Sequence, residues 1–523
     1  MSLNLNWRRK RIWAAVGGIG LGLLACVTPP LETPQTQNQG VGRIYVPQNL
    51  KNKVDILFLI DNSNSMEAMT MELRNRIPSF LDPFAKLAEN GTYADMHIGV
   101  ITSDYGAGAT GAPGCSQSPG GQQGRLQGIG VKAPQNCKKP TGGVNFISFA
   151  YDKNGPGTNN LPMNQNLAET FQCMASVGAS GCGFEHQLES VYAALHNNLP
   201  ENQGFLREDA LLVVVFLTNE DDASAPPDTD VFDKNKTAQY GYEDSYSRQT
   251  RFAVMCCPPG SNDCRADSIQ FPPYADSGGP LAGCQAAPNF PTGAGPGKQY
   301  DISRYIDFFS KVPAQGGVKT NPLDVVLVGI DGAEEPFQVI LSNPGTPAGQ
   351  AYAQCPQLNE SANPPCVPVL QHSCQNPVQP EFFGDPAVRL NTVIRSAKKS
   401  AIGSICDSNY AVALDSAAKE IVSALGGGCI PSAFPKDKVD PMKLDIQCTV
   451  EDVTSNPDGT TTVVSIPQCP ENGPNPGQDP CWRIEPKNTC ASLSPDGVGL
   501  TIDRAGQPAP DHTTAQVSCA FQG

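Results

Sequence analysis

The stretch that most constrains the fold is residues 54–66, VDILFLIDNSNSM. Its apolar run carries no charge after Asp55, which is typical of a strand buried on both faces of a parallel sheet. Asp61, Ser63 and Ser65 follow at alternate positions and supply one carboxylate and two hydroxyls. We therefore expect a hard-oxygen cation site at the carboxyl edge of a sheet. The plainer alternative is a Ser- and Asn-rich turn that only caps the following helix.

Further buried strands and amphipathic helices alternate along the chain. The predicted strands are 54–60, 96–102, 211–217 and 325–330, and the predicted helices are 67–90, 166–176, 185–199, 301–311, 387–399 and 410–425. This alternation predicts an α/β fold with a doubly wound, mostly parallel sheet. Acidic and hydroxyl residues follow four of the strands, and ligands of such sheets bind outside the carboxyl ends of the strands.

Long insertions interrupt the predicted α/β domain, which we place at residues 48–430. They lie near 106–165, 224–298 and 333–385, and each carries cysteines that can staple it without a core of its own. Residues 431–523 are predicted to form a small disulfide-rich β module, because two alternating segments flank an Asn-Pro-Asp-Gly turn there. The module has five cysteines, which is an odd number. We therefore expect either that Cys429 pairs with one of them or that one of them pairs with a cysteine of the main domain.

The N-terminus has the pattern of a targeting segment. Four basic residues at 8–11 precede an apolar run at 12–24, which is short for a membrane span. The segment ends in Leu-Leu-Ala-Cys at Cys26, which resembles a bacterial lipobox. The resemblance implies that residues 1–25 are removed, that Cys26 is lipidated, and that 26–47 form a flexible tether in the cell envelope, at the outer membrane. The alternatives are an uncleaved anchor or an ordinary secretory signal.

Cysteine content and charge limit the classes of function. The chain has 19 cysteines and no C-x-x-C, so without Cys26 an even number remains for disulfides in an oxidising compartment. The net charge of −15 argues against a nucleic-acid partner. Residues 106–111 fit G-x-G-x-x-G, but Pro and Gly follow where a nucleotide site needs a helix, so we expect no nucleotide.

The motif Asp61-x-Ser63-x-Ser65 after a buried strand resembles the metal-ion-dependent adhesion site of von Willebrand factor A domains. The resemblance spans roughly residues 50–430, with interruptions. In place of the family's threonine loop the chain has residues 180–185, where Ser180 or Glu185 could serve. In place of its T-D-G turn the chain has Thr218-Asn219-Glu220. The resemblance implies a divalent cation, Mg²⁺, Mn²⁺ or Ca²⁺, with these candidate ligands: Asp61, Ser63, Ser65, Glu185, Asn219, Glu220 and Asp221.

The altered third position leaves two alternatives for the charge of the site. If Asn219 is the ligand, the cation stays poorly neutralised and takes a carboxylate from a partner. If Glu220 or Asp221 is the ligand, the site is closer to neutral and suits Ca²⁺ held for structure.

Segments around Cys173, Cys182, Phe205 and Cys406 are similar to cysteine-bearing A-domain lipoproteins of deltaproteobacterial or myxobacterial type. This resemblance implies that Cys173 pairs with Cys182. It also implies an interaction role with an envelope or extracellular protein, a membrane contact through lipid, and no enzymatic activity.

Two other functions stay open. One is a metal-dependent envelope hydrolase that uses the acidic edge to activate water, although the sequence places no histidine or lysine near a strand end. The other is a structural envelope protein with a degenerate metal site.

Overall fold

The computed structural model describes residues 39–48, 52–89, 91–107, 115, 121–233, 235, 252–257, 281–287, 298–342, 359, 361–362, 366–407, 409–425, 428–470, 480–491 and 494–522. The chain divides into two compact units, Met1–Gln39 and Gly40–Gly523. The predicted signal segment, Cys26 and the tether up to residue 38 lie outside the described residues. Within the described part, no helix combines the length and apolar character needed to cross a membrane.

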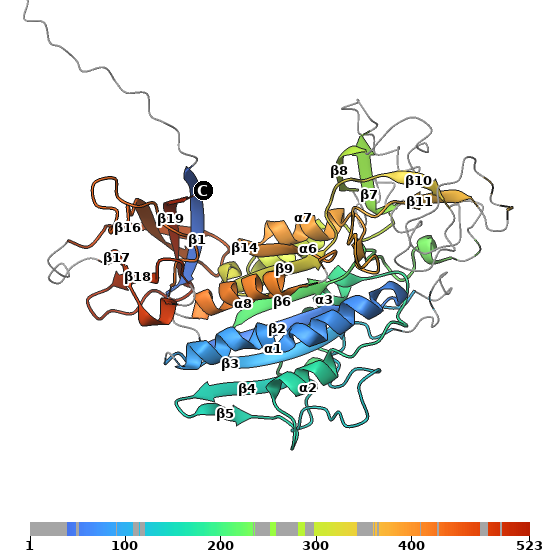
Figure 1. The fold of residues 1–523 in the computed structure, drawn as a ribbon, viewed down its shortest axis with the longest axis horizontal. Coiled ribbons are helices and arrows are strands. Elements are labelled where there is room, and N and C mark those ends of the chain that lie inside the picture. Colours follow the sequence, from blue (N-terminus) through green and yellow to red (C-terminus); the bar gives the residue numbers. More distant parts are fainter. Residues whose placement is uncertain are drawn as a thin grey trace, which may run out of the picture. The chain divides into compact units, whose positions relative to one another are not determined.

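A seven-stranded sheet forms the centre of the second unit (Figure 1). Its strands are β2 (Lys53–Ile60), β3 (Asp95–Thr102), β4 (Ile147–Asp152), β5 (Gly155–Asn159), β6 (Leu211–Leu217), β9 (Val325–Asp331) and β14 (Lys399–Ser404). They lie in the order β14-β9-β6-β2-β3-β4-β5. The pairs β3–β4 and β4–β5 are antiparallel, and the other four pairs are parallel. The predicted α/β class with a mostly parallel sheet is therefore confirmed.

Helices cover both faces of this sheet. They are α1 (Glu67–Glu89), α2 (Leu167–Met174), α3 (Gln187–His196), α6 (Ser303–Ser310), α7 (Val388–Ser396) and α8 (Ala411–Leu425). Val54, Ile56 and Phe58 of β2 pack in one core with α1, α2 and α8, whereas Leu57 and Leu59 pack in another with α3, α6 and α7. Because side chains alternate across a strand, one apolar run serves both cores.

The order of the parallel strands creates a switch point in the sheet. From β2, the chain continues on one side to β3 and then returns to the other side of β2 to form β6. In open α/β sheets, ligands bind outside the carboxyl ends of the strands at such a point. Here the two strands end at Ile60 and Leu217, which are register partners.

The insertions carry short strands, and the first one extends the main sheet through β4 and β5. The others contribute three hairpins: β7 (Val254–Cys257) with β8 (Ala282–Ala286), β10 (Val339–Ser342) with β11 (Val367–Leu370), and β12 (Cys374–Gln375) with β13 (Phe383–Gly384). Short 3₁₀ turns occur at η1 (Asn64–Met66), η2 (Pro200–Asn202), η3 (Asp230–Phe232), η6 (Pro313–Gln315), η7 (Pro322–Asp324) and η8 (Asn488–Cys490).

The C-terminal segment, called the β module below, consists mainly of β-strands, and its sheet includes one strand from the other end of the unit. It contains β15 (Cys448–Ser455), β16 (Thr461–Ile466), β17 (Cys481–Pro486), β18 (Val498–Asp503) and β19 (Thr513–Gln522). Its four-stranded sheet has the order β1-β19-β15-β16, where β1 is Gln39–Pro47. The tether predicted up to residue 47 is therefore too long, because residues 39–47 form a strand of this sheet.

Candidate metal centre

Three strand ends bring the site together at the switch point. Asp61 follows β2, and its backbone N–H donates to Leu217 O at 2.9 Å. Ser103 follows β3 and Thr218 follows β6, the two neighbours of β2 in the sheet. The parallel register therefore places these three polar side chains side by side, as the sequence predicts for the carboxyl edge.

The Asp61 carboxylate is fully buried and accepts several hydrogen bonds. Its Oδ1 accepts from the Ser63 N–H at 2.8 Å and from Ser103 Oγ at 3.0 Å. Its Oδ2 accepts from Thr218 Oγ1 at 2.8 Å. Burial raises the pKa of Asp61 above its ordinary value, and the bonds from Ser63, Thr218 and Ser103 act in the opposite direction. A cation beside this carboxylate would favour its charged form.

Three neutral oxygens form a connected set next to Asp61. Ser63 Oγ lies 3.1 Å from Ser65 Oγ, and Ser65 Oγ donates to Asn219 Oδ1 at 3.0 Å. Asn219 is fully buried, and its Nδ2 has no hydrogen-bond partner among the described atoms. Asn219 Oδ1 therefore faces the serines, whereas Asn219 Nδ2 donates to no acceptor among the described atoms.

The spacing of these oxygens fits a small octahedral cation. Adjacent octahedral ligands of Mg²⁺ at ~2.1 Å are about 3.0 Å apart, whereas those of Ca²⁺ at ~2.4 Å are about 3.4 Å apart. The two hydrogen bonds along the set hold its oxygens 3.1 and 3.0 Å apart, close to the first value. Among the described residues, no group of three or more His, Cys, Asp and Glu side chains could hold a metal ion. A cation here would depend on hydroxyl and amide oxygens.

Glu185 and Glu220 form a carboxyl pair beside this set. The two carboxyl groups lie close to each other, and this proximity favours the protonated form of Glu220. Burial and the charges of Glu185, Asp385 and Asp61 hold the pKa of Glu220 well above its ordinary range. The structure thus brings two of the predicted ligands close to the site, but as neighbouring carboxyl groups that disfavour each other's charge.

Asp221 has a different role from the one predicted. Its Oδ2 accepts from the Arg389 N–H at 2.9 Å and its Oδ1 from the Leu390 N–H at 3.0 Å, so it caps the first turn of α7. Burial raises its pKa to about 6, and the bonds and charge of Arg389 oppose that rise. Both oxygens of Asp221 are used, so we remove it from the candidate ligands.

Its neighbour Asp222 is also a structural residue. It accepts from the Leu188 N–H at 2.9 Å near the start of α3, and its Oδ2 lies 3.1 Å from the buried Arg389 guanidinium. The acidic run after β6 therefore secures two helices around the site.

The loop that replaces the family's threonine segment contacts the motif through its backbone. Gly181 N–H donates to Asn62 O at 2.8 Å, and a Cβ at Gly181 would lie 2.3 Å from Asn62 Oδ1. Glycine is needed at this position because the Asn62 side chain leaves no room for a Cβ. Ser180 is exposed, and Glu185 is buried.

The disulfide pairing implied for this loop is wrong. Cys173 pairs with Cys137, and Cys182 pairs with Cys115. The Cys137–Cys173 bond links the first insertion to α2, and the Cys115–Cys182 bond links it to the loop that follows α2. The resemblance to cysteine-bearing A-domain lipoproteins had implied a bond between Cys173 and Cys182 instead.

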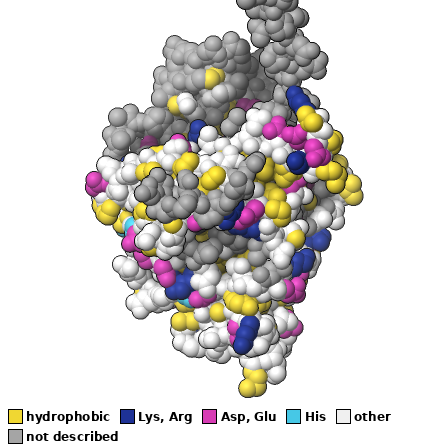
Figure 2. Space-filling view, turned by 90° about the vertical axis from the view of Figure 1, so that its left-hand side faces the viewer, with side chains coloured by type: hydrophobic (Ala, Val, Ile, Leu, Met, Phe, Trp, Pro, Cys, Tyr) yellow, Lys and Arg dark blue, Asp and Glu magenta, His cyan; other side chains and the backbone are white. Residues whose placement is uncertain are grey.

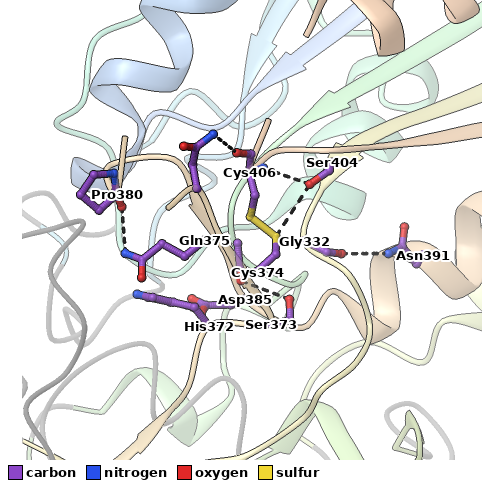
Figure 3. Close-up of a disulfide and its surroundings, with 12 residues drawn as sticks. Gly332, His372, Ser373, Cys374, Gln375, Pro380, Asp385, Asn391, Ser404 and Cys406 are labelled. Atoms are coloured by element: carbon purple, nitrogen blue, oxygen red, sulfur yellow. Dashed lines mark hydrogen bonds and ion pairs between the residues drawn. A yellow bond between two sulfur atoms is a disulfide. The ribbon is translucent and has the colours of Figure 1, made fainter. Parts of the chain in front are cut away.

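A histidine that could not be placed from the sequence is linked to Asn219 through Asp385. Asp385 N–H donates to Asn219 O at 2.8 Å, and His372 Nδ1 lies 2.7 Å from Asp385 Oδ1. Figure 3 shows both residues beside the Cys374–Cys406 disulfide, which ties the third insertion to the segment after β14. The expectation that no histidine approaches a strand end is therefore wrong, because this one comes from an insertion.

Asp331 ends β9 and lies apart from these contacts. Among the described residues no donor makes a well-formed hydrogen bond to either carboxylate oxygen, and the side chain is buried. Burial holds its pKa well above the ordinary range, and Asn391 offsets this only in part. This strand end supplies a buried acid rather than a member of the connected set.

The face drawn in Figure 2, which looks at Figure 1 from its left-hand side, is mixed in charge. Acidic, basic and apolar side chains of the described residues are interspersed there rather than gathered into one positive field. A groove of about 810 Å³ opens beside Ser65, between α1 and the segment 176–180. The candidate ligands Ser63 and Asn219 are buried, so Ser65 is the member of the connected set that reaches this groove.

Comparison with known proteins gives limited information. No protein-family model and no curated protein matches the chain. Similar solved structures include a von Willebrand factor type A protein from Catenulispora acidiphila, with a TM-score of 0.24 and 9% identity over 94% of this chain and 67% of that one. The pilus adhesin RrgA from Streptococcus pneumoniae has a TM-score of 0.27 and 10% identity over 92% and 57%, so this chain spans little more than half of it. The adhesive tip pilin GBS104 from Group B Streptococcus agalactiae gives 0.27 and 10% over 92% and 80%. TM-scores this low carry no argument about function.

Proposed function

We propose that this protein binds a divalent cation at the switch point of its sheet and uses it to bind a carboxylate of another protein. The observation that carries the proposal is the connected set of Ser63 Oγ, Ser65 Oγ and Asn219 Oδ1 beside the buried Asp61. These residues would hold the cation, and their spacing favours Mg²⁺ or Mn²⁺ over Ca²⁺. The cation would supply a positive centre with one protein carboxylate beside it.

The charge of this arrangement favours an outside ligand. The three oxygens of the set are neutral, and the Asp61 carboxylate is bonded to the Ser63 N–H beside them. A divalent cation there keeps net positive charge and attracts an anion. Burial and the neighbouring acids raise the pKa of Glu220, so it offers less charge than its position suggests.

Titration calorimetry on the full-length chain tests the cation site. We expect Mg²⁺ or Mn²⁺ to bind the wild type, and the double variant Asp61→Ala/Ser65→Ala to lose at least about tenfold in affinity. Asp221→Asn is the matched control, because that aspartate caps α7. Equal binding by the wild type and the double variant, or none by either, would remove the proposal.

We also propose that the protein is held at the bacterial envelope by lipid on Cys26 and that it acts by binding rather than by catalysis. The disulfides between described residues support an oxidising location. Metabolic labelling with a palmitate analogue should mark the wild type and leave Cys26→Ala unlabelled. Label on both proteins would refute acylation at this cysteine.

A hydrolytic role is the second candidate, and the His372–Asp385 pair behind Asn219 is the observation that favours it. A His–Asp pair can move a proton, and a nearby cation can activate water. Turnover of peptide or ester panels that needs both Mg²⁺ and His372 would support it. We expect none, because His372 is 9% exposed and is covered by the Phe383 ring.

A further inference from the structure

The groove beside Ser65 follows one wall of α1 away from the candidate cation site. That wall carries Ser65, Thr70, Met71 and Arg74, and the opposite wall carries Lys132 and Ser180. Met71 is 58% exposed although it is apolar and lines the groove. The groove and the site share Ser65, so a segment bound at one enters the other.

Two polar atoms in the α1 wall lack partners. Thr70 is 5% exposed, and its Oγ1 has no hydrogen-bond partner among the described residues. Arg74 Nε, one helical turn further along, is also a buried atom without a partner in the described part of the chain. An unsatisfied buried polar atom costs about 1–3 kcal/mol, and a bound ligand can supply the missing partner. These two atoms therefore indicate that the groove takes a polar segment.

The basic groups of the groove define the charge of that segment. Among the described residues, Arg74 and Lys132 have no ion pair. Arg74 also lines a second hollow of about 420 Å³, which carries Lys138. The acids of the first groove, Glu67 and Glu381, are exposed and stay solvated.

The acid that lines the second hollow already has a hydrogen-bond donor. Glu169 lines the second hollow, but its carboxylate closes the capping box of α2 with the Asn166 N–H. A carboxylate from outside is thus the matching partner for the Arg74 guanidinium, which binds such groups in a planar, two-pronged manner.

The distance between Ser65 and Arg74 sets the spacing of the two carboxylates in a bound segment. Arg74 follows Ser65 by nine residues, or about 13 Å along a helix axis. An extended chain advances ~3.3 Å per residue, so about four residues cover that distance. Arginine side chains on a helix lean toward its N-terminus, which shortens the span to about three or four.

We infer that the groove binds an extended acidic segment of a partner protein, with one carboxylate at the cation beside Ser65 and a second, three or four residues along, on Arg74. This inference rests on the proposed function, because the first carboxylate needs the cation. Thr70 Oγ1 bonds the backbone between the two acids, and Met71 packs against the intervening side chain.

Fluorescence anisotropy with synthetic peptides and the full-length chain tests this inference. The labelled Gly/Ser peptides carry one aspartate, or two at a series of spacings, and are measured in Mg²⁺ and in EDTA. We expect the peptide with two acids at the matching spacing to bind about tenfold more tightly than the single-acid peptide. Arg74→Met should abolish this difference and keep Mg²⁺-dependent binding of the single acid, and Arg76→Met on the same helix is the control.

The outcomes separate the two proposals. Equal affinity for all acidic peptides, or a spacing preference that survives Arg74→Met, would overturn the groove while single-acid binding in Mg²⁺ upholds the cation site. If no acidic peptide binds the wild type in Mg²⁺, both fail. Tighter binding of a lysine-containing peptide than of the acidic peptides would show that the groove selects positive charge, and would overturn the inference.

Discussion

Asn219 is the residue on which the charge of the site depends. It stands where the resembled family has an aspartate, and its Oδ1 is in hydrogen-bond contact with Ser65. Its neutrality leaves the connected set with one adjacent charge, on Asp61. The structure thus favours the first of the two alternatives at this position, since the pKa of Glu220 is raised and Asp221 caps a helix.

Asn219→Asp tests that reading. The added carboxylate should raise Mg²⁺ affinity by about tenfold, because a second negative charge at ~2–4 Å strengthens cation binding. The same charge should weaken Mg²⁺-dependent binding of a single-aspartate peptide, since the cation is then better neutralised. Calorimetry and anisotropy measure the two effects, and a rise or fall in both together would contradict this account.

Asp221→Asn separates the neighbouring acid from the site. An amide can accept only one of the two N–H groups at the start of α7, so we expect a loss of about 1 kcal/mol in the free energy of unfolding. Mg²⁺ affinity should stay within about threefold of the wild type. Denaturant unfolding and calorimetry provide the measurements, and a loss of affinity as large as that of Asp61→Ala would return Asp221 to the ligands.

At the scale of elements, the buried strands were predictable and the edges were not. The strands β2, β3, β6 and β9 follow from their long apolar runs. The strand β14 was not predicted, because Lys399–Ser404 is short, partly polar and at the edge of the sheet. No local pattern marks such a strand.

The same limit applies to the site. The motif at Asp61 and the polar strand ends were visible in sequence, because they follow buried strands directly. The cap at Asp221 was not, since its N–H donors lie 168 and 169 residues further along. His372 and the true partners of Cys173 and Cys182 also depend on where long insertions return, which spacing alone does not encode.

Asp331 at the end of β9 gives a pH prediction at this scale. Its folded pKa is raised, so the stability it contributes is present below its unfolded pKa of about 4 and is lost as pH rises. Asp331→Asn lacks this ionisation. From acid to mildly alkaline pH, its free energy of unfolding should therefore rise relative to that of the wild type by about 1–3 kcal/mol. Denaturant titrations across pH would show a constant difference if the acid were not the cause.

On the scale of the whole molecule, the α/β sheet and the β module have two cores that meet at the Cys429–Cys490 disulfide, which packs with the apolar side chains of the sheet, α1 and α8. The module packs Val450, Trp482 and Val517 in one cluster, and three disulfides lie within it: Cys429–Cys490, Cys448–Cys519 and Cys469–Cys481. Cys429 joins the module cysteines, as expected. Asn321, just before β9, bonds Thr514 and Ser455 of the module, so a small polar contact connects the two.

Removing one module disulfide should therefore leave the cation site intact. Cys448 and Cys519 are register partners on β15 and β19, and Cys448→Ala/Cys519→Ala should cost the module about 2–4 kcal/mol. Mg²⁺ affinity should change less than about twofold, because no module residue enters the connected set. Hydrogen exchange would locate the loss to residues 430–522, and equal loss of protection in β2 and β6 would show that the cores are coupled.

The position of β1 decides where a pull on the chain is felt. This strand opens the second unit, yet it lies beside β19 in the sheet built by the other end of the chain. Tension from any attachment N-terminal to β1 reaches this ladder of backbone hydrogen bonds first. The strand β2, which leads to Asp61, follows β1 in the chain but lies in a different sheet. The β1–β19 ladder must therefore shear before the pull reaches β2, so the β module shields the site from load on that end of the chain.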